Sequence, residues 1–242
     1  MIEDVVKMLK ELRLKNCAEN IRDTLDEAGQ KNLSPLQTIE RLLALELEAR
    51  RKSRIAQRFK QSKLDERLTI DQFDFKHHES RQRHKNLILR LLDLEFVQQK
   101  GDIILIGNPG VGKTFLAKCV GYAATQAGIR TLFTTTMDMV NHLIAANADH
   151  SLLKKLHYYQ SQDVLAVDEL GYLPLGRQGS NLFFQVISAR HKKKSTIITT
   201  NLPFAKWGKV FGSTTVATAI ADRLVHNSEI LILEGPSYRK RS

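Results

Sequence analysis

A glycine-rich loop between a predicted strand and a predicted helix constrains this chain more than any other feature. The loop is Gly107-Asn108-Pro109-Gly110-Val111-Gly112-Lys113-Thr114, which follows the pattern G-x-x-x-x-G-K-T. The apolar run 102–106 before the loop predicts a buried strand, and the segment 115–120 after it predicts a helix. This order favours a phosphate-binding loop over a chance glycine-rich turn.

Each part of the loop has an expected role. The glycines let successive backbone N–H groups point toward phosphates, and the helix N-terminus adds a partial positive charge. We expect Lys113 to reach the β- and γ-phosphates of a nucleotide and the Thr114 hydroxyl to bind Mg²⁺. The candidate nucleotide-binding residues therefore run from Gly107 through Phe115.

Helical and extended patterns alternate from about residue 84 onward, which indicates an α/β domain with a parallel sheet and crossover helices. This domain is expected to cover residues 84–242. The expected strands are 102–106, 129–135, 163–169, 195–201 and 230–233. The expected helices are 86–99, 115–120 and beyond, 137–146, 152–160 and 182–191.

The first part of the chain predicts a small, all-helical domain over residues 1–64. Apolar residues recur at helical spacing over 5–29, and Ser34-Pro35 supplies a helix start for a long helix that reaches about Gln61. Residues 65–83 are expected to form a linker that docks on the next domain, partly extended, with exposed histidines at 77, 78 and 84 that match no zinc pattern.

The charge balance points to nucleic acid. Among 242 residues the formal net charge is +11 and the isoelectric point is about 9.7, as expected of a nucleic-acid binder. The alternative is a merely basic protein, or one that meets acidic surfaces. Within the long helix and just after it, seven basic residues occur without an acid: Arg50, Arg51, Lys52, Arg54, Arg58, Lys60 and Lys63.

These seven residues are the favoured DNA contacts, although a solvated helix face would have the same composition. Lys154 and Lys155 are weaker candidates. The chain contains two distant cysteines, no signal-peptide pattern at its N-terminus and no apolar run long enough to span a bilayer. We therefore expect a cytoplasmic protein with reduced thiols and no membrane partner.

Paired acids follow the strand expected at 163–169. Asp168 and Glu169 end this strand, and an open α/β sheet places ligand-contacting residues there. A carboxylate at Asp168 would hold Mg²⁺, and Glu169 would orient and deprotonate an attacking water. The alternative, a helix-capping acid beside an exposed neighbour, is weakened by the phosphate-binding loop upstream.

Two later residues complete a candidate catalytic set. Asn201 ends the next strand, where its amide would reach the γ-phosphate or the attacking water, but Asn201-Leu202-Pro203 is equally a good turn. Arg223 lies on a predicted helix. It would stabilise transition-state charge if it faced a γ-phosphate, while a solvated arginine is the commoner occurrence.

This order of motifs resembles the AAA+ ATPases, and several segments are similar to IstB, the ATP-binding helper family of two-gene bacterial insertion sequences. The segments that carry the resemblance are 168–175, 202–207, 222–227, 235–240 and the basic helical N-terminus with Asp74-Phe75. The similarity covers nearly the whole chain. The sister family, the DnaC helicase loaders, shares the core but has a different N-terminal region.

The resemblance implies a specific activity. IstB-like proteins bind double-stranded DNA with ATP, form homo-oligomers on it, deform it and stimulate the partner transposase IstA. By this resemblance Lys113 and Thr114 are Walker A residues, Asp168 and Glu169 Walker B, Asn201 sensor 1, Arg223 an arginine finger toward a neighbouring subunit, and Arg239 a sensor 2 candidate. A DnaC-like loader of the replicative helicase is the alternative function.

Overall fold

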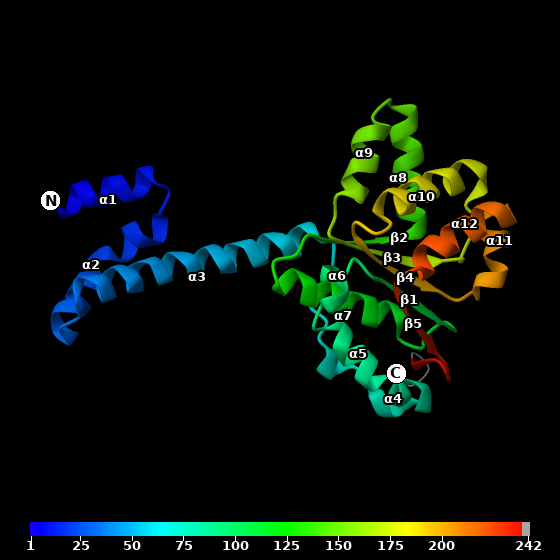
Figure 1. Cartoon of the computed structure of the whole chain (residues 1–242), viewed down its shortest axis with the longest axis horizontal. Coiled ribbons are helices and arrows are strands. Elements are labelled where there is room, and N and C mark those ends of the chain that lie inside the picture. The colour runs from blue at the N-terminus through cyan, green and yellow to red at the C-terminus, as the bar shows by residue number, and fades with distance from the viewer. Residues whose placement is uncertain (239–242) are drawn as a thin grey trace. The chain divides into compact units, whose positions relative to one another are not determined.

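The computed structural model describes residues 1–238 and is shown in Figure 1. The chain forms two compact units, the first covering Met1–Gln57 and the second beginning at Arg58. The boundary falls inside the long helix α3 (Pro35–Gln61). Within the described residues, no helix combines the length and the apolar character required to cross a bilayer.

The first unit contains α1 (Ile2–Glu11), α2 (Lys15–Lys31) and most of α3. Its small core includes Cys17, Ala18 and Ile21. The buried carboxylate of Glu46 on α3 accepts hydrogen bonds from the backbone N–H groups of Asn16 and Cys17, at 2.8 and 3.2 Å. Because the first N–H groups of a helix lack partners within it, this carboxylate both caps α2 and ties it to α3.

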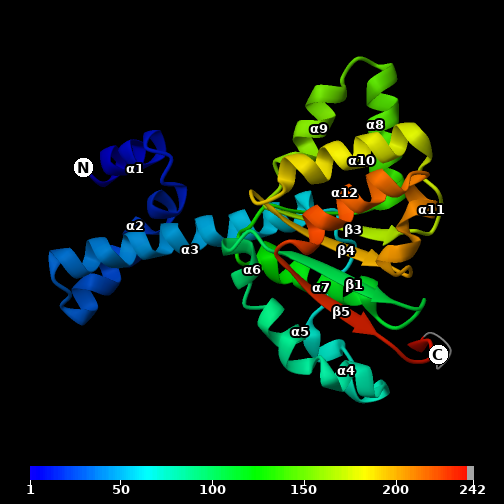
Figure 2. The same ribbon diagram turned by 45° about the vertical axis from the view of Figure 1, so that its right-hand side comes forward.

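A parallel sheet forms the centre of the second unit, as Figure 2 shows. Its strands are β1 (Asp102–Gly107), β2 (Thr131–Thr135), β3 (Val164–Leu170), β4 (Ser195–Thr200) and β5 (Ser228–Leu233). Their order is β2-β3-β4-β1-β5, and every adjacent pair is parallel. The predicted α/β class with a parallel sheet flanked by helices is confirmed.

Helices cover both faces of the sheet, as a parallel sheet requires. On β1, Ile104 packs into the core on one face, whereas Ile103 and Leu105 pack into the core on the other, because side chains alternate along a strand. The Ile104 face is covered by α8 (Thr136–Ala148), α10 (Gly176–Arg190), α11 (Trp207–Phe211) and α12 (Thr214–Val225). The opposite face is covered by α5 (Lys85–Leu91), α6 (Glu95–Gln98) and α7 (Lys113–Gln126).

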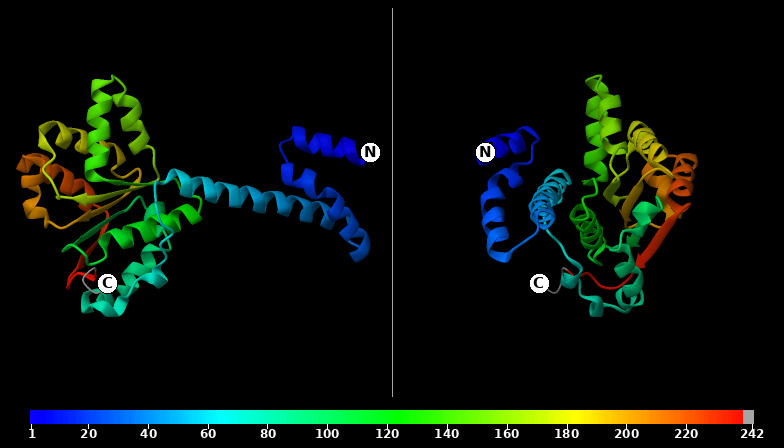
Figure 3. Two further views of the ribbon diagram at one scale, coloured as in Figure 1. Left: turned by 180° about the vertical axis from the view of Figure 1, so that it is seen from behind. Right: turned by 60° about the vertical axis from the view of Figure 1, so that its left-hand side comes forward.

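The remaining helices lie around this core. Helix α9 (Leu152–Gln160) lies beside α8, and the two form a helical pair visible in Figure 3. The short elements are α4 (Glu79–Arg83) and the 3₁₀ turns η1 (Ile70–Gln72), η2 (Phe75–His77) and η3 (Phe204–Lys206).

Three local expectations were wrong. The segment expected to be extended around residues 70–75 forms the turns η1 and η2 instead. The backbone N–H of Thr69 donates to Gln72 Oε1 at 3.5 Å, and the Asp74 side chain caps η2 by accepting a hydrogen bond from the backbone N–H of Lys76 at 2.9 Å. The helix expected over 86–99 is interrupted by Leu94, whose φ of 61° is left-handed. The histidines expected to be exposed are only partly so; His77 Nε2, for example, lies 3.2 Å from the carbonyl oxygen of Pro236.

Candidate nucleotide-binding site

The glycine-rich loop connects β1 to α7 at the carboxyl edge of the sheet. Gly110 and Gly112 have φ values of 83° and 104°, a region that side chains with a Cβ rarely occupy. A Cβ on Gly112 would lie only 2.7 Å from the Phe73 ring. Gly112 is therefore required for its backbone angle and for the close approach of Phe73.

Lys113 begins α7 and folds back over the loop. Its Nζ donates hydrogen bonds to the carbonyl oxygens of Gly107 and Asn108, at 2.8 and 2.9 Å. The ammonium group therefore lies within the turn of the loop, where the sequence pattern predicts phosphates.

A hydroxyl and a carboxylate meet across the sheet edge. Thr114 Oγ1, on the first turn of α7, lies 3.0 Å from each carboxylate oxygen of Asp168 on β3. The Asp168 carboxylate also accepts a hydrogen bond from the Thr199 hydroxyl on β4. Asp168 is 4% exposed, so these contacts fix its orientation. The donor set of one hydroxyl and one carboxylate consists of hard oxygen ligands, which suit Mg²⁺.

Glu169 points in a different direction from Asp168. Its φ of 61° is left-handed, and the pairing of β3 with β4 shifts register between Val167 and Leu170. Its backbone N–H donates to Thr199 Oγ1 at 3.0 Å, which supports the irregular backbone, and the side chain is exposed. A β-bulge of this kind redirects a side chain, so the side chains of the consecutive acids Asp168 and Glu169 point in different directions.

A cavity of about 240 Å³ lies between the loop and these strand ends. It is lined by Pro109, Gly110, Lys113, Thr114, Glu169, Tyr172, Thr199, Thr200 and Asn201. The structure thus brings Glu169 and Asn201 to the same cavity as the predicted phosphate-binding residues. Thr199, which contacts both acids of β3, was not identified from the sequence because a threonine inside a buried strand carries no distinguishing pattern.

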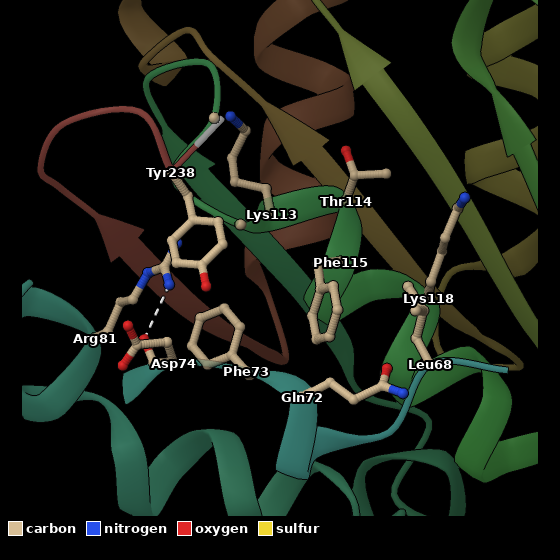
Figure 4. Close-up of a pocket in the computed structure, with 12 residues that line it drawn as sticks. Leu68, Gln72, Phe73, Asp74, Arg81, Lys113, Thr114, Phe115, Lys118 and Tyr238 are labelled. Atoms are coloured by element: carbon tan, nitrogen blue, oxygen red, sulfur yellow. Dashed lines mark hydrogen bonds between the residues drawn. The ribbon is translucent and has the colours of Figure 1, made fainter. Parts of the chain in front are cut away.

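A second cavity, of about 280 Å³, lies on the other side of the loop (Figure 4). Its lining residues are Leu68, Gln72, Phe73, Asp74, Arg81, Gly110, Gly112, Lys113, Thr114, Phe115, Lys118 and Tyr238. Residues 68–81 and Tyr238 were not among the predicted site residues. The aromatic residues of the linker and of the closing block 235–240 were visible signals, but nothing in their spacing indicated that they meet beside the loop.

Arg81 joins three segments around this second cavity. Its guanidinium donates to the carbonyl oxygen of Val111 from two nitrogens, at 3.2 and 2.9 Å, and to that of Asp74 at 2.9 Å. It also lies over the rings of Phe73 and Tyr238, at 4.5 and 5.2 Å. Arg81 is only 3% exposed, and burial lowers its pKa. It therefore acts as a fixed cationic support beneath the loop.

The segment after β5 crosses over the loop. The backbone N–H of Tyr238 donates to the carbonyl oxygen of Gly110 at 3.0 Å, and Ser237 lies so close that a Cβ on Gly110 would meet its Oγ at 2.0 Å. Figure 4 shows the Tyr238 ring between Arg81 and Lys113. The predicted nucleotide contact Arg239 lies outside the described residues.

Arg223 lies on α12, apart from both cavities. Its guanidinium lies over the Phe184 ring at 4.8 Å and donates to the carbonyl oxygen of Ala219 at 2.7 Å. It is half-buried and lines neither of the two cavities beside Lys113. Within one subunit, the structure therefore does not bring Arg223 together with the other predicted catalytic residues.

The predicted DNA contacts divide between the two units. Arg50, Arg51, Lys52 and Arg54 belong to the first unit, and Arg58, Lys60 and Lys63 belong to the second. Arg50 has a structural contact, because its guanidinium pairs with Glu46 at 2.7 Å and donates to the carbonyl oxygen of Arg13. Arg51 and Arg54 are exposed. Lys154 is exposed as well, while Lys155 lies 5.7 Å from the Tyr158 ring centroid.

Two solved structures with a similar fold are replication proteins. The chain resembles the crystal structure of the DnaC helicase loader with a TM-score of 0.60 and 27% identity, over 68% of this chain and 96% of that one. It resembles the replication initiator DnaA bound to AMPPCP and single-stranded DNA with a TM-score of 0.61 and 18% identity, over 72% of this chain and 52% of that one. The second likeness concerns the fold alone, which is that of a P-loop AAA+ domain.

Sequence relatives come from insertion sequences. The chain is 38% identical over 241 residues to the ATP-binding protein of insertion sequence IS5376 from Geobacillus stearothermophilus, covering 100% of this chain and 95% of that protein. It is 36% identical to the ATP-binding protein of insertion sequence IS21 from Pseudomonas aeruginosa, covering 96% of this chain and 87% of that protein. The family model of the IstB-like ATP binding protein matches residues 7–242. The chain therefore belongs to the IstB-like family of ATP-binding proteins.

Proposed function

We propose that this protein hydrolyses ATP, binds double-stranded DNA as a homo-oligomer and stimulates the transposase of its insertion sequence. The observation that carries the ATPase part is the meeting of Thr114, Asp168 and Glu169 at the loop. Membership of an ATP-binding family from insertion sequences supports the transposition part.

The loop would hold the phosphates. Backbone N–H groups between Gly107 and Phe115 would donate to phosphate oxygens, and Lys113 would exchange its carbonyl contacts for β- and γ-phosphate oxygens. Thr114 and Asp168 would hold Mg²⁺, which neutralises charge on the phosphates when bound. The cavity beside Phe73 and Tyr238 would take the nucleoside, since three aromatic rings, those of Phe73, Phe115 and Tyr238, line it together with polar groups.

Glu169 and Asn201 would act on the water molecule that attacks the γ-phosphate. The exposed carboxylate of Glu169 lines the cavity beside Lys113 and Thr114, where it would accept a proton from the attacking water. Asn201 lines the same cavity, and its amide would orient that water or a γ-phosphate oxygen. Asp168 would bind Mg²⁺ and Glu169 would act on the water, because the bulge directs their side chains differently.

Arg223 would complete the site of a neighbouring subunit. Its distance from both cavities of its own subunit supports a role in trans. An arginine that contacts a γ-phosphate stabilises the transition state by about 10³–10⁵ in rate. Hydrolysis would then require an oligomer.

The alternative function is the loading of a replicative helicase, favoured by the likeness to the DnaC loader. The two functions differ in the molecule on which the oligomer would assemble: duplex DNA for the transposition helper, and the helicase for the loader. The test is to size the purified protein with ATP, with ADP, and with ATP plus a long DNA duplex, and to measure ATPase activity in each mixture.

The outcomes separate the two functions. Large assemblies that require both ATP and duplex DNA, with accelerated hydrolysis, would support the transposition helper. A monomer in all three mixtures that assembles only with a replicative helicase would support the loader. Retention of the transposase on DNA only in the presence of this protein and ATP would support the transposase partnership.

A further inference from the structure

A basic groove lies in the second unit at the opposite end of the strands from the nucleotide site. It has a volume of about 460 Å³ and begins beside the first residue of β2. We call it the β2 groove. Its lining residues are Arg58, Lys60, Gln61, Lys63, Arg130, Thr131, Tyr158 and Gln162. Four of these residues are cations and none is an acid.

One wall of the groove is anchored on the sheet. The backbone N–H of Phe133 on β2 donates to the carbonyl oxygen of Ser62 at 2.7 Å. Arg58 Nε donates to the carbonyl oxygen of Gly128 at 3.2 Å, and Leu64, 6% exposed, packs near Gly121. Lys60 and Lys63 are therefore presented by a segment held against the domain rather than by a loose chain end.

Asp163, which directly follows the lining residue Gln162, is already neutralised. Asp163 receives hydrogen bonds from Arg130 and Lys194, so two cations share one carboxylate. The side chain of Arg130 remains 45% exposed. The local charge is therefore positive after these ion pairs are counted, and an anion would meet no acid among the lining residues.

The floor of the groove carries one aromatic ring. Tyr158 is half-buried and held edge-on against Tyr159 at 5.1 Å, and Lys155 adds a further cation 5.7 Å from its ring centroid. Proteins that bind single strands present several aromatic rings on which successive bases stack. A groove with four cations and one ring suits a sugar–phosphate backbone better than a row of unstacked bases.

We propose that the β2 groove binds the sugar–phosphate backbone of duplex DNA, with Lys60, Lys63 and Arg130 as phosphate contacts. This inference rests on the proposed DNA-binding function. It assigns the main DNA contact to the ATPase domain instead of the exposed arginines of the first unit. The groove lies where β2 and β3 begin, and Asp168 lies near the end of β3. DNA and nucleotide would therefore occupy opposite ends of the same strands.

The test compares two double variants. Lys60→Gln with Lys63→Gln removes two exposed cations from the groove. Lys206→Gln with Lys209→Gln removes two exposed cations that follow the other end of β4, and serves as the matched control. Binding to a labelled duplex and to a single strand of the same sequence is measured by fluorescence anisotropy between about 50 and 200 mM salt, with circular dichroism as a check of folding.

The groove variant should bind duplex about tenfold or more weakly, and its slope of log affinity against log salt should be shallower by roughly 2. The control should match the wild type. Wild-type affinity and slope in the groove variant, with losses in Arg51→Gln/Arg54→Gln instead, would overturn the inference while leaving the proposed function intact. Tighter binding of the single strand would overturn the duplex assignment. Absence of DNA binding by the wild type would overturn both.

Discussion

Thr114 Oγ1 lies 3.0 Å from both carboxylate oxygens of Asp168, although 53 residues separate the two positions in the chain. The contact joins the first turn of α7 to a buried strand. It places a hydroxyl and a carboxylate where the phosphate-binding loop meets the sheet, which is the arrangement that a magnesium–nucleotide complex requires.

The first prediction concerns this pair. Asp168→Asn keeps the size of the side chain but removes its charge, so Mg²⁺ should be held poorly and ATP hydrolysis should fall on the order of a hundredfold or more. Steady-state phosphate release at increasing Mg²⁺ measures the effect. Asp149→Asn, at an exposed position, is the control, and an Asp168→Asn enzyme with wild-type rate and Mg²⁺ dependence would refute the assignment.

The second prediction separates Glu169 from Asp168. Glu169→Gln should retain nucleotide binding but lose hydrolysis by about 10²–10⁴, because the base is removed while the Mg²⁺ ligand stays. The ATP-bound assembly should then accumulate on DNA. Sizing in ATP and duplex checks this, with Glu229→Gln at an exposed position as control. Assembly no better than that of the wild type would mean that Glu169 is not the base.

The third prediction tests the shared site. Arg223→Ala should bind ATP normally yet hydrolyse it about 10³–10⁵ times more slowly. Mixing Arg223→Ala with Lys113→Ala subunits should restore part of the activity, since some interfaces then combine an intact loop with an intact arginine. If the mixture is no more active than its components, Arg223 does not act across a subunit interface.

The fourth prediction concerns the loop backbone. Gly112→Ala forces a Cβ to within 2.7 Å of the Phe73 ring at a φ of 104°, so nucleotide affinity should fall at least tenfold and the domain should lose about 1–3 kcal/mol of stability. Gly29→Ala, in helix α2 with no atom within 4 Å of the new Cβ, should instead add about 0.5–1 kcal/mol. Calorimetric titration and denaturant unfolding measure both effects, and equal behaviour of the two variants would contradict the argument.

The fifth prediction is a pH dependence. Burial alone would raise the pKa of Asp163, but hydrogen bonds from Arg130 and Lys194 outweigh it and lower the pKa from 3.8 to about 2. A depressed carboxyl pKa stabilises the fold above the unfolded value and loses this stabilisation as pH falls from about 4 to about 2. The loss should be about 1–2 kcal/mol after solvent screening is allowed for.

Denaturant unfolding of the wild type and of Asp163→Asn at neutral pH and through this acid range measures that difference. The variant should be less stable than the wild type near neutral pH and should converge with it near pH 2. A constant difference across the range would show that the pKa of Asp163 is not depressed in the folded state.

The sequence by itself determined the local chemistry and the fold class. The loop, the strand before it and the helix after it are adjacent in the chain, so their pattern predicted β1, the loop and α7. Apolar runs that alternate with helical patterns predicted the other strands, since strands buried on both faces of a parallel sheet are apolar along most of their length. Two consecutive acids at the end of such an apolar run carry a signal, because a buried strand otherwise contains few charged residues.

Tertiary structure alone decided which distant residues meet. The direction of Glu169 depends on a bulge whose backbone is supported by Thr199, and Arg81 lies beneath the loop because Val111, Asp74 and Tyr238 converge on it. Basic residues occur along the whole run 50–63, and the sequence does not distinguish among them. Packing nevertheless pairs Arg50 with Glu46 and leaves Lys60 and Lys63 lining a groove. Contacts between residues 30 to 160 positions apart depend on how the helices and strands pack, and a one-dimensional pattern carries no record of that packing.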